Sequence, residues 1–177
     1  TCRGLIVLSK YLLNYLSDKI NNVNLKFIKH PIVNIEYAKF NMDNIKNNDN
    51  LKIIQLGSQL RYLSTIFKLK TSYKKIWLPG RKDNNLLMKW LYKESLTYNI
   101  HLDDEEIRNV EIFYTNNFKE YDYIVSNNII IIHLINSSAN NAVLELMNLN
   151  IPFFVNKLPA VVEYLGNEYP LYFDSIQ

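Results

Sequence analysis

The chain has 177 residues, of which 48% are hydrophobic and 21% are charged, and its formal net charge is +3. This balance is typical of a globular protein of one domain, or of one domain with a terminal arm. The lysines and arginines are scattered, which argues against nucleic-acid binding, because nucleic-acid-binding proteins gather these residues on one face. No apolar run approaches the roughly 20 residues of a membrane helix, so we expect no integral membrane segment.

The first fifty residues predict a small βαβ arm. An apolar strand at residues 5–8 precedes a helix over residues 10–20 that Ser9 is placed to cap. A second strand, residues 25–29, ends at His30-Pro31, and residues 41–50 are polar enough to predict a loop. We expect residues 1–50 to be a connector or the tail of a preceding domain, and residues 51–177 to be the main domain.

Strands and helices alternate through the remainder of the chain. The expected strands are residues 51–56, 73–78, 110–114, 129–134, 151–155 and 171–173. The expected helices are residues 60–69, 84–98, 118–125, 139–149 and 159–165. This alternation predicts an α/β fold with a Rossmann-like parallel sheet and helices on both faces. The strand at 129–134 shows no polar alternation, so we expect both of its faces to be covered.

A polar turn and a polar helix stripe follow that buried strand. Ligands of open α/β sheets bind at such strand-to-helix turns, where a helix N-terminus offers free N–H groups to a phosphate. On the expected helix, Ser138, Asn141, Glu145 and Asn148 share one stripe, while Val143, Leu144 and Met147 are free to pack elsewhere. The alternative is that the stripe is only the solvated face of a surface helix.

The expected helix and the strand after it contain the run L-E-L-M-N-L-N-I-P-F-F-V, residues 144–155. This run is similar to the second half of E-G-F-G-x-x-x-x-E-A-M-A-x-G-x-P-V-V, and in it the C-terminal third resembles the C-terminal domain of GT-B glycosyltransferases of the group-one type. The resemblance implies that Glu145 holds the ribose of a nucleotide-sugar donor, and that Pro152 takes the place of the family proline. The helix that contains Glu163 is similar to the next helix of the family.

The resemblance also has departures. Ser137 stands where the family has its first Glu, the turn S-S-A-N-N replaces the glycine-rich turn, and Asn150 replaces a glycine. We expect the turn to hold the donor through its N–H groups together with Asn140 or Asn141, with Ser138 as the helix N-cap. The alternative is that these serines and asparagines are ordinary turn residues.

The first strand of the main domain supports the resemblance. Its end, Q-L-G-S-Q-L-R, stands where the family has a glycine turn and a basic residue that meets the donor diphosphate. Gly57 would permit close approach of the backbone to a ligand, and Arg61 would bridge phosphate oxygens. The alternative for Arg61 is an ordinary surface cation on a helix.

Other polar residues carry weaker signals. Arg81 and Lys82 follow another strand but suit a plain solvated turn, and His133 either faces the site or belongs to the core. The acidic run at residues 103–106 suits the first turn of a helix, and no Asp-x-Asp occurs, so no metal is expected. Tyr121 and Tyr123 are expected to pack.

These observations predict half of a glycosyltransferase. We expect a cytoplasmic protein, since the sequence shows no signal peptide and its one cysteine, Cys2, allows no internal disulfide. The chain begins at Thr1 in sequence typical of a domain interior, so we expect a fragment that lacks most of an N-terminal GT-B domain and is inactive alone. It would bind a nucleotide-sugar donor and no further cofactor. The alternative is a non-catalytic binding or assembly module on the same fold.

Overall fold

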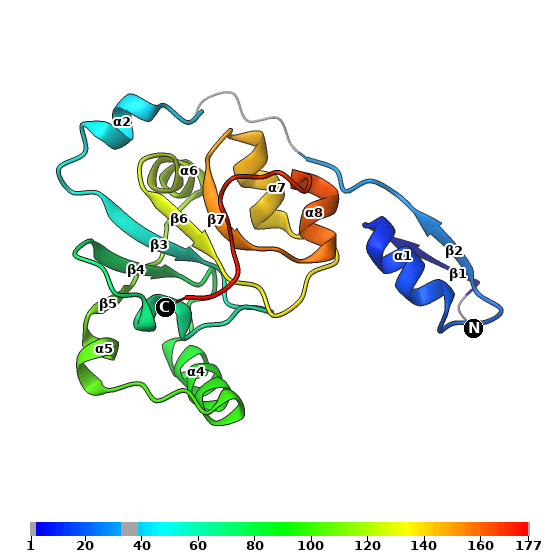
Figure 1. The fold of residues 1–177 in the computed structure, drawn as a ribbon, viewed down its shortest axis with the longest axis horizontal. Helices are drawn as coiled ribbons and strands as arrows, with labels where there is room; N and C mark the ends of the chain where they lie inside the picture. Colours follow the sequence, from blue (N-terminus) through cyan, green and yellow to red (C-terminus); the bar gives the residue numbers. More distant parts are fainter. Residues whose placement is uncertain (1–2, 33–38, 177) are drawn as a thin grey trace.

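The computed structural model describes residues 3–32 and 39–176; Cys2 lies outside this part of the chain. Its main feature is a six-stranded sheet with the order β5-β4-β3-β6-β7-β8, in which every pairing is parallel (Figure 1). The strands are β3 (Lys52–Leu56), β4 (Lys74–Leu78), β5 (Val110–Ile112), β6 (Ile129–Ile132), β7 (Phe153–Asn156) and β8 (Tyr172–Phe173). The predicted Rossmann-like parallel sheet is therefore confirmed.

Helices cover both faces of this sheet, and neighbouring residues of the central strands β3, β4 and β6 point into two different apolar clusters. In β3, Ile54 and Leu56 belong to one apolar cluster, whereas Ile53 belongs to a second. The first cluster includes residues of α6 (Phe118–Ser126), α7 (Asn141–Asn148) and α8 (Pro159–Leu165). The second includes residues of α3 (Thr65–Lys68), α4 (Asn84–Tyr98) and α5 (Asp104–Arg108). Burial on both sides explains why these strands lack polar alternation.

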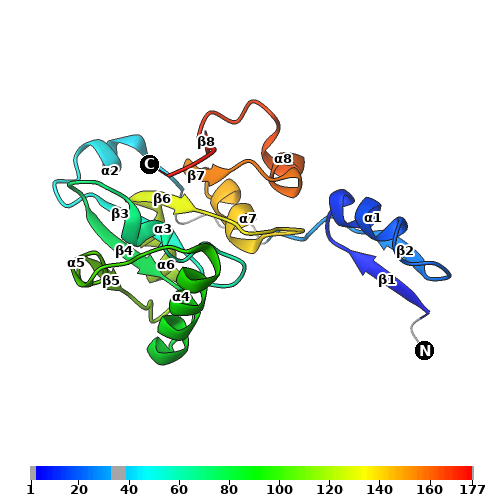
Figure 2. The same ribbon diagram turned by 60° about the horizontal axis from the view of Figure 1, so that its bottom comes forward.

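The N-terminal residues form a separate βαβ unit. Strands β1 (Gly4–Val7) and β2 (Asn24–Phe27) pair in parallel with each other, and α1 (Lys10–Ser17) connects them. As predicted, Ser9 caps α1, accepting a hydrogen bond from the N–H of Leu12 at 3.1 Å. Figures 1 and 2 show this unit beyond α7 and α8, at the far end of the molecule from β5.

A carboxylate of the main domain binds the start of α1. Glu163 of α8 accepts hydrogen bonds from the N–H groups of Lys10 and Tyr11, at 2.8 and 3.0 Å. The hydroxyl of the next residue, Tyr164, donates to the carbonyl of Leu8 at 2.8 Å. The free N–H groups of a helix N-terminus favour such an anionic partner. Glu163 therefore joins the two parts of the molecule.

Apart from α1, which ends at Ser17 rather than at residue 20, three predictions about helices were wrong in detail. A short helix, α2 (Met42–Lys46), lies within the segment expected to be a loop, with Asn41 as its N-cap. The helix expected over residues 60–69 is reduced to α3, because Leu60 has a φ of 55° and Arg61 makes a bridge to Leu134 beside the end of β6. The third error, at the start of α7, concerns the site and is described below.

Candidate functional site

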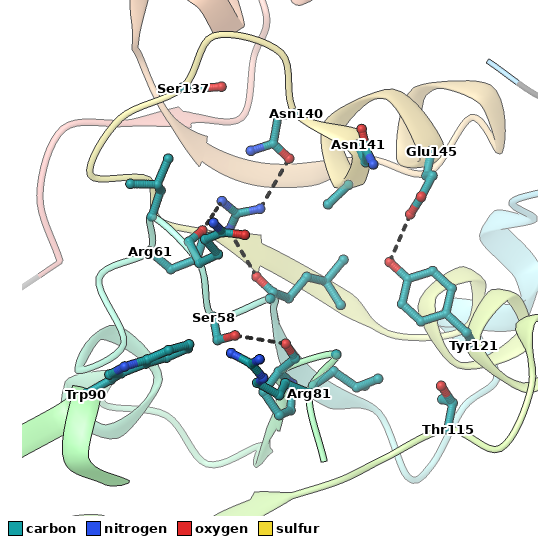
Figure 3. Close-up of a pocket in the computed structure, with 18 of the residues that line it drawn as sticks. Ser58, Arg61, Arg81, Trp90, Thr115, Tyr121, Ser137, Asn140, Asn141 and Glu145 are labelled. Atoms are coloured by element: carbon teal, nitrogen blue, oxygen red, sulfur yellow. Dashed lines mark hydrogen bonds between the residues drawn. The ribbon is translucent and has the colours of Figure 1, made fainter. Parts of the chain in front are cut away.

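The carboxyl ends of β3, β4, β5 and β6 and the start of α7 enclose a cavity of about 990 Å³. This is the edge of an open parallel sheet where ligands bind. All seven residues predicted for the donor site line it: Gly57, Arg61, Ser137, Ser138, Asn140, Asn141 and Glu145. Residues far apart in the sequence thus converge on one cavity (Figure 3).

Gly57 fixes the turn after β3. Its φ is 80°, a left-handed conformation that favours glycine, and a Cβ there would lie 3.3 Å from Nε of Arg61. Its N–H donates to the carbonyl of Leu78 at 2.7 Å, and its carbonyl accepts from the indole N–H of Trp77 at 2.9 Å. The backbone at the cavity floor is therefore held on both sides.

Arg61 is buried, with 8% of its surface exposed, rather than a surface helix cation. Its guanidinium donates to the carbonyls of Leu56 and Gln59 at 3.2 and 3.0 Å, and to Oδ1 of Asn140 at 3.2 Å. Burial lowers its pKa to about 10, which leaves it charged at neutral pH. Neither ion pair of the described residues includes Arg61. A buried cation at the cavity therefore has no acidic counterion in this part of the chain.

The turn before α7 is organised by Asn140. Its side chain, rather than that of Ser138, is the N-cap: Oδ1 accepts from the N–H of Val143 at 3.3 Å as well as from Arg61. The helix consequently begins at Asn141, not at Ala139. The predicted cap at Ser138 was wrong because the long-range bond from Arg61 fixes Asn140 at that position. Ser137 is buried, and Ser138 is half-buried in the same wall of the cavity.

Glu145 lies half-buried in the cavity wall and has a partner that the sequence did not indicate. The hydroxyl of Tyr121, on α6, donates to Oε2 of Glu145 at 3.4 Å (Figure 3). Burial raises the pKa of Glu145 above its usual value, and the hydrogen bond from Tyr121 acts in the opposite direction. Burial also raises the pKa of Tyr121. Tyr121 does pack against the core as expected, but its hydroxyl belongs to the cavity.

The wall across the cavity from α7 carries further cations. Arg81 and Lys82 follow β4, and Cζ of Arg81 lies 5.6 Å from the ring centroid of Trp90 on α4. The ionised residues that line the cavity are therefore Arg61, Arg81, Lys82 and one carboxylate, Glu145. This excess of positive charge favours an anionic ligand.

Other candidates lie elsewhere. His133 does not line the cavity: it contacts the rings of Tyr62 and Phe173, bonds Oγ1 of Thr65 at 2.7 Å, and has its pKa lowered to about 4 by burial. Asp103 and Glu106 form a capping box at the start of α5, as the acidic run suggested. In the described part of the chain, no group of three His, Cys, Asp or Glu side chains is placed to hold a metal ion. No described helix is long and apolar enough to cross a membrane.

Comparisons with known proteins bear on the fold. No family profile and no curated protein matches the sequence. Among solved structures, a glycosyltransferase from Rickettsia africae ESF-5 is similar, with a TM-score of 0.55 and 14% identity over 93% of this chain. An α,α-trehalose-phosphate synthase (UDP-forming) from Burkholderia vietnamiensis gives a TM-score of 0.53 and 12% identity, again over 93%.

The chain has the fold of one half of a GT-B glycosyltransferase. It spans 47% and 46% of those two structures, about half of each. The resemblance to the C-terminal half, which the sequence suggested, is thereby confirmed at the level of fold. At the replaced family glycine, Asn150 has a φ of 56°, a conformation that asparagine adopts more readily than most residues. The departure from the family pattern at that position therefore preserves the backbone.

The lining residues that the sequence did not indicate as site residues include Trp90, Tyr114 and Tyr121. Trp90 was interpreted as part of a helix, Tyr121 as a packing residue and Tyr114 as part of a strand. Their place in the cavity depends on where neighbouring strands end, and no local pattern records that. Tyr114 and Asn84 are hydrogen-bonded, which ties the end of β5 to the start of α4.

Proposed function

We propose that this chain is the donor-binding half of a GT-B glycosyltransferase and that its cavity binds a nucleotide sugar through the diphosphate. The observation that carries the proposal is Arg61, a buried cation without an acidic partner among the described residues. Buried charges are normally paired. A diphosphate would supply the missing negative charge between Arg61 and the N-terminus of α7.

The remaining predicted residues have roles compatible with this ligand. The carboxylate of Glu145 would accept hydrogen bonds from the ribose hydroxyls, and the N–H groups of residues 137–141 would hold the phosphates or the sugar. In a donor-bound structure we expect the donor within hydrogen-bond distance, about 3 Å, of residues 137–141. During transfer, Arg61 and the backbone dipoles would stabilise the diphosphate leaving group.

Residues 51–177 would form the donor-binding domain, and residues 1–50 the connector or the tail of a preceding domain. The acceptor and much of the catalytic apparatus would lie on an N-terminal GT-B domain. The 177-residue chain alone should therefore bind a nucleotide but show no glycosyl transfer. Measurable turnover by this chain would contradict the division.

Calorimetric titration with UDP, GDP, ADP and pyrophosphate tests the proposal. We expect at least one nucleoside diphosphate to bind and to raise the unfolding temperature further as its free concentration increases. The matched control is Lys74→Met, because Lys74 is a cation at the opposite end of β4, paired with Glu111 at 2.6 Å. That variant should bind as the unchanged protein does. If no probe binds at millimolar concentration, the proposal is wrong.

One observation favours a second candidate, a non-catalytic binding module. Ser137 replaces the first Glu of the family pattern, and a short neutral side chain cannot do the work of a carboxylate. Nucleotide binding is expected in both cases. Transfer activity of a longer protein that includes the N-terminal domain separates the two candidates.

A further inference from the structure

The cavity has a wall whose chemistry differs from that of the phosphate-binding turns. Arg81 lies in the loop after β4 and Trp90 lies on α4, and both face the cavity across from Asn140, Asn141 and Glu145 (Figure 3). Cζ of Arg81 is 5.6 Å from the ring centroid of Trp90, within the range of a cation–π contact. The indole therefore holds the guanidinium beside the cavity.

This wall is preorganised by its surroundings. The hydroxyl of Ser58 donates to the carbonyl of Pro79 at 3.1 Å, which ties the loop before Arg81 to the turn after β3. Gly80, with a φ of 74°, makes the bend that precedes Arg81. The hydrogen bond between Tyr114 and Asn84 anchors the first residue of α4, the helix that carries Trp90. A preorganised wall loses less entropy when a ligand binds.

Diphosphate and ribose leave part of the cavity unfilled. At about 990 Å³, the cavity lies near the upper end of the size range of small-molecule sites. Arg61 and α7 contact the phosphates in the proposed complex, and Glu145 contacts the ribose. A nucleotide offers one further group, a flat base, and flat bases stack on guanidinium planes and aromatic rings.

We infer that Arg81, held by Trp90, is the stacking platform for the base of the nucleoside diphosphate, an assignment that rests on the proposed function. Arg81 contacts the base, and Trp90 is a positioning residue that acts through Arg81. The platform contacts the face of the base rather than its edges, so it favours nucleotides over base-free phosphates and tolerates different bases.

The test uses the 177-residue chain with UMP and with ribose 5-phosphate, in which a hydroxyl group replaces the base, and with pyrophosphate as a phosphate probe. For the unchanged protein, we expect UMP to bind about tenfold more tightly than ribose 5-phosphate, as measured by calorimetry. Arg81→Lys keeps the charge but loses the plane. It should remove most of that difference while pyrophosphate affinity changes by less than about twofold.

Trp90 is tested by a graded pair of variants. Trp90→Leu should weaken UMP binding by about fivefold without affecting pyrophosphate, and Trp90→Phe should restore most of the loss because phenylalanine still offers a ring to Arg81. A purely structural role would not produce that rescue. Trp90 also packs against the second core cluster, so if Trp90→Leu fails to fold, the exposed Arg81→Lys decides the matter alone.

Lys82→Gln is the matched control, since Lys82 lines the same wall but is not the cation placed over Trp90. It should weaken UMP and pyrophosphate alike, as a loss of charge alone would. Two outcomes would overturn the platform and leave the proposed function standing. The unchanged protein could bind UMP and ribose 5-phosphate with equal affinity, or Arg81→Lys could weaken the binding of UMP and of pyrophosphate equally. If UDP, GDP, ADP, UMP and pyrophosphate all fail to bind, the proposed function fails and the platform fails with it.

Discussion

Arg61 and Lys75 are both buried cations, with 8% and 9% of their surfaces exposed, and neither belongs to an ion pair of the described residues. Their surroundings differ. Lys75 donates from Nζ to the carbonyls of Phe67 and Leu69, at 3.0 and 3.4 Å, beside the end of α3. Those carbonyls lack helical partners, so they are available to accept hydrogen bonds from the buried ammonium group of Lys75.

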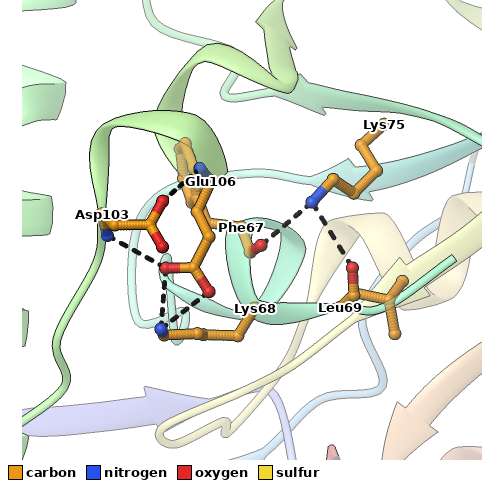
Figure 4. Close-up of polar contacts among 6 residues, drawn as sticks. All are labelled: Phe67, Lys68, Leu69, Lys75, Asp103 and Glu106. Carbon is orange, nitrogen blue, oxygen red and sulfur yellow. Dashed lines mark hydrogen bonds and ion pairs between the residues drawn. The ribbon is translucent and has the colours of Figure 1, made fainter.

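The neighbourhood of Lys75 also contains acidic groups. Lys68 pairs with Glu106 at 2.7 Å on the same side of the sheet (Figure 4), and the charge of Glu106 partly offsets the lowering of the Lys75 pKa by burial. At Arg61, no carboxylate of residues 3–32 and 39–176 acts in this way. The comparison therefore separates a cation that is surrounded by the fold from one that also lines the cavity.

The most severe change should be Arg61→Met. Three acceptors, including Oδ1 of Asn140, lose their donor, and we expect the free energy of unfolding to fall by about 1–3 kcal/mol. Loss of the cation should also weaken nucleoside diphosphate binding by about thirtyfold or more. Denaturant titration and calorimetry measure the two effects.

Arg61→Lys is the control for that variant. A lysine keeps the charge but cannot reproduce the geometry of the guanidinium, so it should be destabilised nearly as much yet retain part of the ligand affinity. If Arg61→Met binds nucleoside diphosphate as tightly as the unchanged protein, then Arg61 contributes only to the stability of the fold, as Lys75 does.

Lys75→Met should affect stability alone. Methionine keeps most of the apolar contacts of the stem, whereas the carbonyls of Phe67 and Leu69 lose a donor. We expect the free energy of unfolding to fall by about 1 kcal/mol, because the variant no longer buries a charge, and this offsets part of the cost of the lost hydrogen bonds. Nucleotide affinity should stay within about twofold of the original value by calorimetry. A larger drop in affinity would show that the two cations are not functionally distinct.

Glu145→Gln should weaken the ligand and strengthen the fold. In the proposed complex Glu145 accepts charge-assisted hydrogen bonds from the ribose, so the loss of its charge should reduce nucleotide affinity by about tenfold. Burial raises the pKa of Glu145, so its ionised form disfavours the folded state at neutral pH. The neutral glutamine should therefore raise the unfolding temperature near pH 7.

The pH profile provides the check on Glu145. Its contribution to stability is fully present below the unfolded pKa and is lost as the pH rises through the raised folded pKa. The advantage of Glu145→Gln should hence disappear in acid, and ligand binding by the unchanged protein should weaken as Glu145 becomes protonated. Equal nucleotide affinity of Glu145→Gln and the unchanged protein at neutral pH would show that Glu145 does not contribute to nucleotide binding.

The contrast between Arg61 and Glu145 shows what the sequence can predict. The strands follow from apolar runs, and α4 was predicted at its observed bounds. In the structure Asp83 caps its start, and Asn99, with a φ of 53°, ends it. These signals are local. The position of Arg61, by contrast, depends on distant contacts: its backbone forms a bridge with Leu134 beside β6, and its side chain donates to Asn140. Both partners are more than seventy positions away in the sequence.

The same distinction explains the rest of the site. The turn that contains Ser137 and the position of Glu145 were predictable from one strand–turn–helix pattern. The hydroxyl of Tyr121 comes from α6, whereas Arg81 follows the end of β4 and Trp90 lies on α4, which covers the opposite face of the sheet from α7. Only the order of the strands brings them together, and periodicity in the sequence predicts parallel strands but not their order.

The smallest effect should come from Glu106→Gln, which removes the negative charge that acts on Lys75 in the comparison above. Glu106 does two things: it pairs with Lys68, and its Oε2 accepts from the N–H of Asp103 at 3.0 Å to complete the capping box (Figure 4). Glutamine retains the capping bond but not the charge. The ion pair is partly solvent-exposed, so we expect a loss of less than about 1 kcal/mol, which high salt should reduce further. The lowered pKa of Glu106, due mainly to Lys68, means that this contribution is present above the unfolded pKa and is lost in acid, where the variant and the original protein should converge in stability.

Denaturant titrations at two salt concentrations and two pH values measure these differences. Nucleotide affinity should not change, because Glu106 does not line the cavity; a change would mean that charges near Lys75 influence the site, and that the two cationic regions are coupled through the sheet.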